Sequence, residues 1–157
     1  SPTQQHFTAS FHREKFWEHA SFLRRHSAWM SFLSFDHVAI SERFIRHVLE
    51  GEPESTLGGH KYGMSRPGKT EFPVSWTEEH IVEAMNTVLQ GPEVVTFSGK
   101  RIFLQKTVRG VHIELKLLVT KKGLTPVSCF PIGGEGVVRN VAGRQIPLDT
   151  YKENEGE

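Results

Sequence analysis

The feature of this sequence that most constrains its fold is a change in the spacing of apolar residues along the chain. Residues 3–50 contain neither Gly nor Pro, and apolar residues recur every three or four positions over 11–35, which predicts a helix. After Gly91-Pro92 the apolar spacing changes to two, which is typical of strands. Helices followed by strands favour an α+β fold over alternating α/β units.

Two shorter helices are predicted from their end signals. Ser41 is a suitable N-cap and Gly51 a suitable stop for a helix between them. Thr77 is a second N-cap, followed by a helix that ends at Gly91-Pro92. We expect the N-terminal helices to pack on a four- to five-stranded antiparallel sheet. Its strands are predicted in VVTFSG, KRIFLQKTV, VHIELKLLVT, LTPVSCFP and GVVRNV.

The length of 157 residues is that of a single globular domain. We expect a helical N-terminal segment over 1–40, a compact domain over 41–148 and a flexible tail over 149–157. The single Cys129 excludes an intramolecular disulfide and a cysteine-based zinc site. No apolar run is long enough for a membrane-spanning helix and the start lacks the layout of a signal peptide, so we expect no stable membrane insertion.

Charge is distributed unevenly, although the net charge is only +1. Residues 51–148 carry an excess of Lys and Arg over Asp and Glu, whereas the last nine residues are acidic. A mildly basic domain is compatible with a phosphate-bearing partner but does not require one.

The long segment 51–76 is rich in Gly and Pro and contains a possible catalytic set. His47 lies directly before this segment, His60 follows Gly58-Gly59, and Lys69 lies in a second glycine-flanked stretch. Two imidazoles can take up and return protons near neutral pH, and an ammonium group stabilises a negatively charged transition state. This set suits RNA cleavage by the neighbouring 2′-OH, which needs no metal or outside nucleophile. The other histidines have ordinary structural explanations.

Three blocks of the chain resemble the EndoU-type endoribonucleases. RHVLEGEPESTLGGHKYG resembles their two-histidine signature, in which His, two hydrophobic residues, any residue, Gly and an acid precede Gly-Gly-His. GKTEFPVSWTEEHIVEAM resembles the Gly-Lys-Thr-x-Phe-Pro block of the compact bacterial members, and VRGVHIELKLLVTKKGLTPVSCFP resembles their hairpin and final motif. The blocks have the family's order and cover about residues 43–132.

The resemblance implies His47 and His60 as the acid/base pair, with His60 favoured as base, and Lys69 as the electrostatic partner. Lys100 and Lys106 are the alternatives to Lys69. Ser128 and Phe130, with Gly59, are implied to bind the nucleotide. Phe130 stands where the family has tyrosine, so it keeps the stacking ring but loses the hydroxyl, which weakens any expectation of uridine preference. No cofactor or metal is implied.

The resemblance further implies a barnase-, colicin- and RelE-like fold and cleavage to 2′,3′-cyclic phosphate and 5′-OH ends, with tRNA the expected substrate. Compact members are toxin domains of longer secreted or contact-delivered proteins. They act in the cytoplasm of a neighbouring bacterium, and a cognate immunity protein inhibits them in the producer. Two other hypotheses stay open, a non-catalytic RNA- or protein-binding module and a metal-dependent hydrolase that uses both histidines with Glu50 or Glu52.

Overall fold

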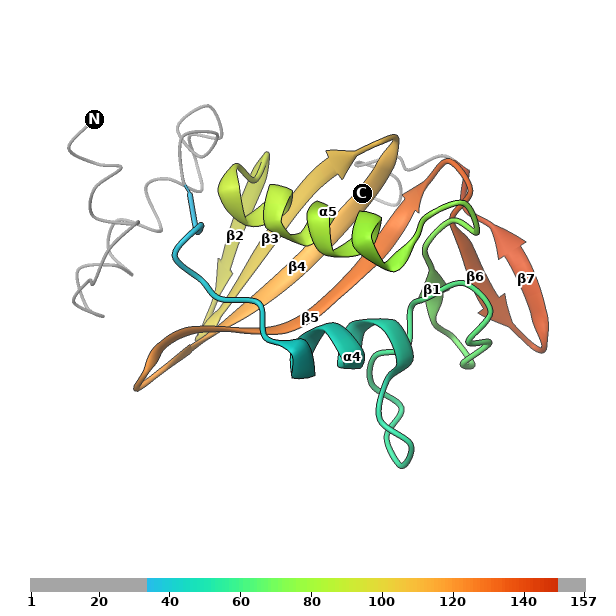
Figure 1. The fold of residues 1–157 in the computed structure, drawn as a ribbon, viewed down its shortest axis with the longest axis horizontal. Helices are drawn as coiled ribbons and strands as arrows, with labels where there is room; N and C mark the ends of the chain where they lie inside the picture. The colour runs from blue at the N-terminus through green and yellow to red at the C-terminus, as the bar shows by residue number, and fades with distance from the viewer. Residues whose placement is uncertain (1–33, 150–157) are drawn as a thin grey trace.

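The computed structural model describes residues 34–149 (Figure 1). Residues 1–33 and 150–157 therefore lie outside the described residues. They include most of the predicted helix over 11–35, most of the predicted segment 1–40 and nearly all of the predicted tail 149–157. Residues 34–40 form a turn and extended chain instead of the helical segment expected there. The fully buried Phe35 explains this, because its side chain belongs to the core and its amide donates to Leu89 O at 2.6 Å.

Both capped helices are confirmed. Helix α4 spans Glu42–Glu50, with Ser41 Oγ accepting from Phe44 N at 3.1 Å. Helix α5 spans Glu78–Gln90, and Thr77 forms a capping box with its N3 residue, a histidine. Polar caps satisfy amides at the start of a helix that have no partner within the helix. No helix in the described part of the chain is long and apolar enough to cross a membrane.

Two antiparallel sheets complete an α+β architecture among the described residues. The larger sheet has the order β2-β3-β4-β5 and confirms four predicted strands, namely Val94–Ser98, Arg101–Val108, Val111–Thr120 and Gly123–Gly134. The smaller sheet has the order β1-β6-β7, from Thr70–Glu71, Val138–Val141 and Arg144–Pro147.

The smaller sheet corrects the prediction of one four- to five-stranded sheet. The predicted strand GVVRNV pairs as β6 with β1 and β7 and does not extend the larger sheet. Strand β1 has two residues and β7 is exposed throughout, so neither shows the alternation by which strands are recognised.

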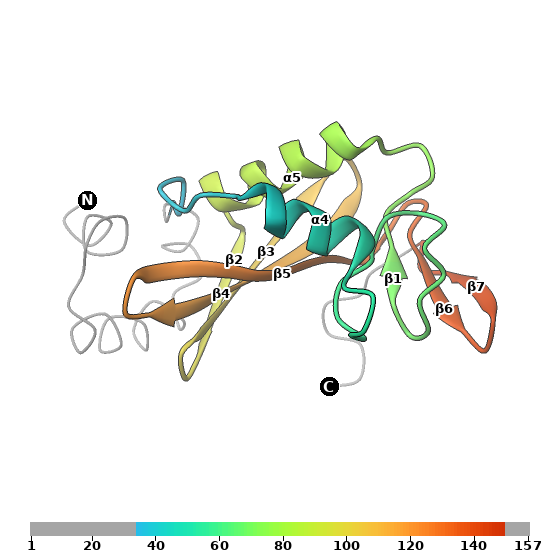
Figure 2. The ribbon, with the colours of Figure 1, turned by 60° about the horizontal axis from the view of Figure 1, so that its bottom comes forward.

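Helix α5 lies across one face of the larger sheet, and α4 lies beside its edge strand β5 (Figure 1 and Figure 2). Strand β4 alternates strictly between buried and partly exposed residues, and its buried side chains form the core together with those of α5. Helix α4 packs along β5, at the edge of this sheet. The opposite face carries the partly exposed residues of each strand, among them Lys116 on β4 and Ser128 on β5.

A buried carboxylate joins the smaller sheet to the glycine-rich segment. Glu71 is fully buried, and its oxygens accept from the amides of Gly63 at 2.9 Å and Ser65 at 2.7 Å. They also accept from Asn140 Nδ2 at 2.9 Å and Gln145 Nε2 at 3.3 Å. Four donors compensate the carboxylate for its loss of water.

Replacing this carboxylate tests its structural role. Glu71→Gln substitutes an NH₂ group for one acceptor oxygen. The groups that donate to that oxygen would then face another donor. We expect the free energy of unfolding to fall by about 2–3 kcal/mol, measured by urea denaturation. Glu54→Gln, at an exposed position of the same segment, is the control and should change stability little. Equal effects of the two substitutions would contradict the role given to Glu71.

Candidate active site

The end of α4 brings His47 and His60 together. The last carbonyls of a helix have no partner within the helix, and here three of them accept hydrogen bonds from consecutive amides of the glycine-rich segment. The pairs are Gly59 N to His47 O at 3.1 Å, His60 N to Val48 O at 2.7 Å and Lys61 N to Leu49 O at 3.0 Å. The segment therefore runs against the helix end, beside the turn that carries His47.

Gly58 permits this close approach. Its φ of +75° lies in the left-handed region, and a Cβ at this position would lie 2.2 Å from His47 O. A side chain would therefore clash with backbone that cannot move without opening the helix end. Gly63 has a similar φ of +94°, but a Cβ there would meet no atom within 4 Å.

Arg66 organises the rest of the segment. Its guanidinium group donates to four backbone carbonyls, those of Glu50, Glu52, Ser55 and Leu57. A planar group with five N–H donors can bind several carbonyls at once, so residues 50–57 are held around one side chain. This loop carries Glu52, whose Oε1 lies 3.5 Å from His47 Nδ1.

His60 is 6% exposed and has a defined tautomer. Its Nδ1 lies 2.7 Å from Thr70 O, and a carbonyl can only accept, so Nδ1 carries the hydrogen and Nε2 has the lone pair. Burial lowers the pKa of His60 from 6.5 to about 4, with a smaller contribution in the same direction from the charge of Lys69. The ring is therefore a neutral proton acceptor at physiological pH.

Lys69 is held through its backbone by the smaller sheet. Asn140 N donates to Lys69 O at 2.9 Å, and Gly68 N donates to Asn140 O at 2.8 Å. The Lys69 ammonium group forms no ion pair with residues of the described range. It is available to a ligand.

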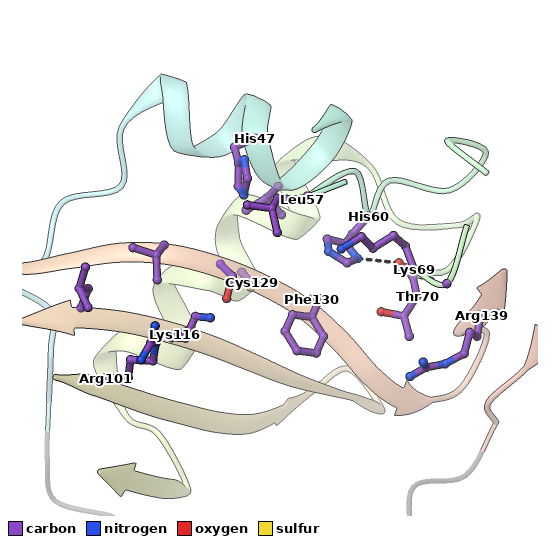
Figure 3. A pocket seen from close by; sticks show the side chains of 16 residues that line it. His47, Leu57, His60, Lys69, Thr70, Arg101, Lys116, Cys129, Phe130 and Arg139 are labelled. Carbon is purple, nitrogen blue, oxygen red and sulfur yellow. Dashed lines mark hydrogen bonds between the residues drawn. The ribbon is translucent and has the colours of Figure 1, made fainter. Parts of the chain in front are cut away.

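One cavity of about 520 Å³ joins most of the predicted site residues (Figure 3). His47, His60 and Lys69 line it on the side of α4 and the glycine-rich segment. Ser128 and Phe130, which belong to strand β5, line the side formed by the larger sheet. The ring of Phe130 stacks on that of His60 with centroids 5.6 Å apart.

The remaining predicted residues lie outside the cavity lining. Gly59 binds the end of α4, and its neighbour Gly58 lines the cavity in its place. Of the alternative lysines, Lys106 donates to Gly91 O at 2.6 Å and Lys100 lies in the exposed turn between β2 and β3. Neither alternative lines the cavity.

Several cavity residues were not among the predicted catalytic or nucleotide-binding residues, although the sequence offers Arg101 as an RNA contact under the binding-module hypothesis. Arg101, Lys116 and Arg139 line it, so that with Lys69 it has four cationic side chains, and no carboxylate lines it. Two hydroxyl oxygens in the lining, Thr70 Oγ1 and Ser128 Oγ, are buried without a hydrogen-bond partner. Native proteins rarely leave buried polar atoms unpaired, so a group that enters the cavity, either a ligand or water, completes their hydrogen bonds. Alternation within β4 was the available signal for Lys116, because it places that residue on the open face.

A bound metal ion would need several ligand side chains grouped at one point. Within residues 34–149 no three His, Cys, Asp or Glu side chains are placed to hold one. Glu50, one of the two carboxylates considered with the histidines, pairs with Arg46 at 2.8 Å. Cys129 lines the cavity, but its burial raises the pKa of the thiol.

The cavity thus combines a neutral histidine, a second histidine beside a carboxylate, unpaired cations and buried hydroxyls. This arrangement can bind a polyanion, withdraw a proton and stabilise added negative charge. Comparison of the chain with known protein families, with curated proteins and with solved structures finds no match in any of the three.

The contact between Gly58 and α4 predicts a difference between two glycine substitutions. Both introduce a side chain at positive φ, which costs about 1–2 kcal/mol. We expect Gly63→Ala to lower the free energy of unfolding by this amount and no more. Gly58→Ala should cost about 2–3 kcal/mol more, because the methyl group collides with the helix backbone. Urea unfolding of the two variants measures the difference, and equal losses would contradict the packing described.

The pKa of His60 predicts an acid-sensitive fold. Between pH 6.5 and 4 the unfolded chain takes up a proton at this residue and the folded chain does not. We therefore expect the free energy of unfolding to fall by about 3 kcal/mol from this residue as the pH falls through that window. In the His60→Gln variant this fall in the free energy of unfolding should be absent. In the His37→Gln variant, which changes an exposed position, it should remain. An NMR titration that places the pKa of His60 near 6.5 would overturn the prediction.

Proposed function

We propose that this protein is an EndoU-type endoribonuclease that cleaves RNA by metal-independent attack of a 2′-OH on the adjacent phosphate. The observation that carries the proposal is the cavity shared by His47, His60, Lys69, Ser128 and Phe130, in which cations are not balanced by carboxylates. The motif order adds to this support. An anionic substrate suits such a cavity.

His60 acts as the general base. Its Nδ1–H is held by Thr70 O, so Nε2 is the nitrogen that can accept a proton, and its low pKa keeps it unprotonated at neutral pH. It takes the proton of the ribose 2′-OH while O2′ forms a bond to phosphorus.

His47 and Lys69 complete the reaction. The bond from phosphorus to the 5′ oxygen breaks as His47, which extends from α4 into the cavity (Figure 3), gives that oxygen a proton. Glu52 orients the His47 ring through Nδ1. Lys69 stabilises the charge on the pentacoordinate phosphate. The products are a 2′,3′-cyclic phosphate and a 5′-OH.

Ser128 and Phe130 hold the nucleotide that supplies the 2′-OH. The unpaired Ser128 hydroxyl offers a hydrogen bond, and the Phe130 ring offers a face for stacking. Because phenylalanine has no hydroxyl, base selection rests on fewer polar contacts than a tyrosine would allow.

The biological role we infer is that of a growth-inhibiting toxin. The domain would be delivered as part of a longer secreted polypeptide and would act in the cytoplasm of a neighbouring bacterium. Transfer RNA is the expected substrate, and a cognate immunity protein is the expected partner. These proposals rest on the motif resemblance to compact EndoU-type toxins.

The second candidate function is a non-catalytic RNA- or protein-binding module. The stacking of Phe130 on His60 favours it, because the ring covers one face of the proposed base. This candidate predicts salt-sensitive RNA binding without a cut product.

Cleavage of total tRNA in excess EDTA, followed by analysis of the fragment ends, separates these functions. We expect discrete fragments that end in 2′,3′-cyclic phosphate. His47→Ala and His60→Ala should each lower the rate by about 100-fold or more, and Lys69→Ala by a similar factor. The wild-type rate should fall as the pH drops through about 4, where His60 becomes protonated.

The control is His37→Ala, which changes an exposed histidine outside the cavity and should cleave at the wild-type rate. Equal losses in all three histidine variants would overturn the site. No cleavage in EDTA, with manganese or with cell extract would favour the binding module. Cleavage that EDTA abolishes and metal restores would favour a metal-dependent hydrolase.

A further inference from the structure

We propose that Arg101 and Lys116 form a subsite for a second phosphate of the bound strand, next to the phosphate that is cleaved. The inference rests on the proposed function, because it takes the ligand to be a polynucleotide. It specifies the substrate class, because a site with two phosphate positions selects a chain over a dinucleotide.

Strand register brings the two cations together on the open face of the larger sheet. Lys116 pairs with Phe103 of β3, and Arg101 lies two residues from Phe103 on the same face of that strand. Diagonal neighbours of this kind lie within reach of long side chains. Figure 3 shows both side chains on the sheet side of the cavity, opposite the helix that carries His47.

The same register connects this pair to the proposed catalytic residues. Lys116 lies directly opposite Ser128 of β5, whose buried hydroxyl has no hydrogen-bond partner. Two residues further along β5, Phe130 stacks on His60. A line of residues therefore runs across three strands from Arg101 to the base, and a nucleotide held at Ser128 would have its neighbouring phosphate beside Lys116.

The charges of the pair are not balanced within the described residues. Neither Arg101 nor Lys116 forms an ion pair there, and no carboxylate lines the cavity. Glu114 lies on the same face of β4, but it is outside the lining and accepts from Gln105 Nε2 at 3.0 Å. Two unpaired cations beside an unpaired hydroxyl form a site for a phosphate.

The test compares binding and cleavage of strands that differ in phosphate number. Binding is measured with uncleavable 2′-O-methyl RNA, as a hexanucleotide and as a dinucleotide, over a range of salt concentrations. Cleavage is measured with DNA strands of both lengths that contain a single ribonucleotide. The variants are Arg101→Gln and Lys116→Gln, and the control is Lys121→Gln, which removes a charge from the exposed turn between β4 and β5.

We expect each cavity variant to weaken hexanucleotide binding by about tenfold and to lower the salt dependence by about one released ion. KM for the hexanucleotide substrate should rise by a similar factor. Binding and cleavage of the dinucleotide should stay within twofold of the wild-type values. Lys121→Gln should behave as wild type. Equal losses on both lengths, or no loss in either cavity variant, would overturn the subsite. Binding that shows the expected pattern without any cleavage would keep the subsite and reject the proposed ribonuclease.

Discussion

The site depends on the hydrogen bonds between the last carbonyls of α4 and the amides of residues 59–61. A helix end must find partners for these carbonyls, and using consecutive amides of the next segment places His60 beside the turn that bears His47. The close contact at Gly58 and the carbonyl ligands of Arg66 make this arrangement compact. One local junction thus supplies both proposed acid/base residues.

The two sides of the cavity contribute different physical properties. The side formed by α4 and the glycine-rich segment buries His60 and so lowers its pKa, while Glu71 and Asn140 hold the backbone near Lys69. The sheet side supplies cations and hydroxyls that have no partners in the described chain. Buried hydroxyls without a partner lower stability, and proteins keep such groups where a ligand completes their hydrogen bonds.

Much of the fold and of the candidate site was predictable, for identifiable reasons. Ser41 and Thr77 mark helix starts because their side chains satisfy helix amides locally, and the alternation in β4 reflects burial of one face. Motif resemblance predicts His47, His60 and Lys69 as site residues, and the three line one cavity. Strand β7 could not be predicted because all its residues are exposed. The sheet to which GVVRNV belongs could not be predicted either, because alternation does not specify a partner strand.

The sequence by itself determined the elements and the chemical types available, because caps, spacing and motif residues act over a few positions. Only the tertiary structure decided which cations besides Lys69 accompany the histidines. Lys116 and Arg139 enter the cavity through the pairing of β4 with β5 and of β6 with β1, and Thr70 through the bond of its carbonyl to His60. Such pairings join residues far apart in the chain, and their energies depend on the packed sheet as a whole.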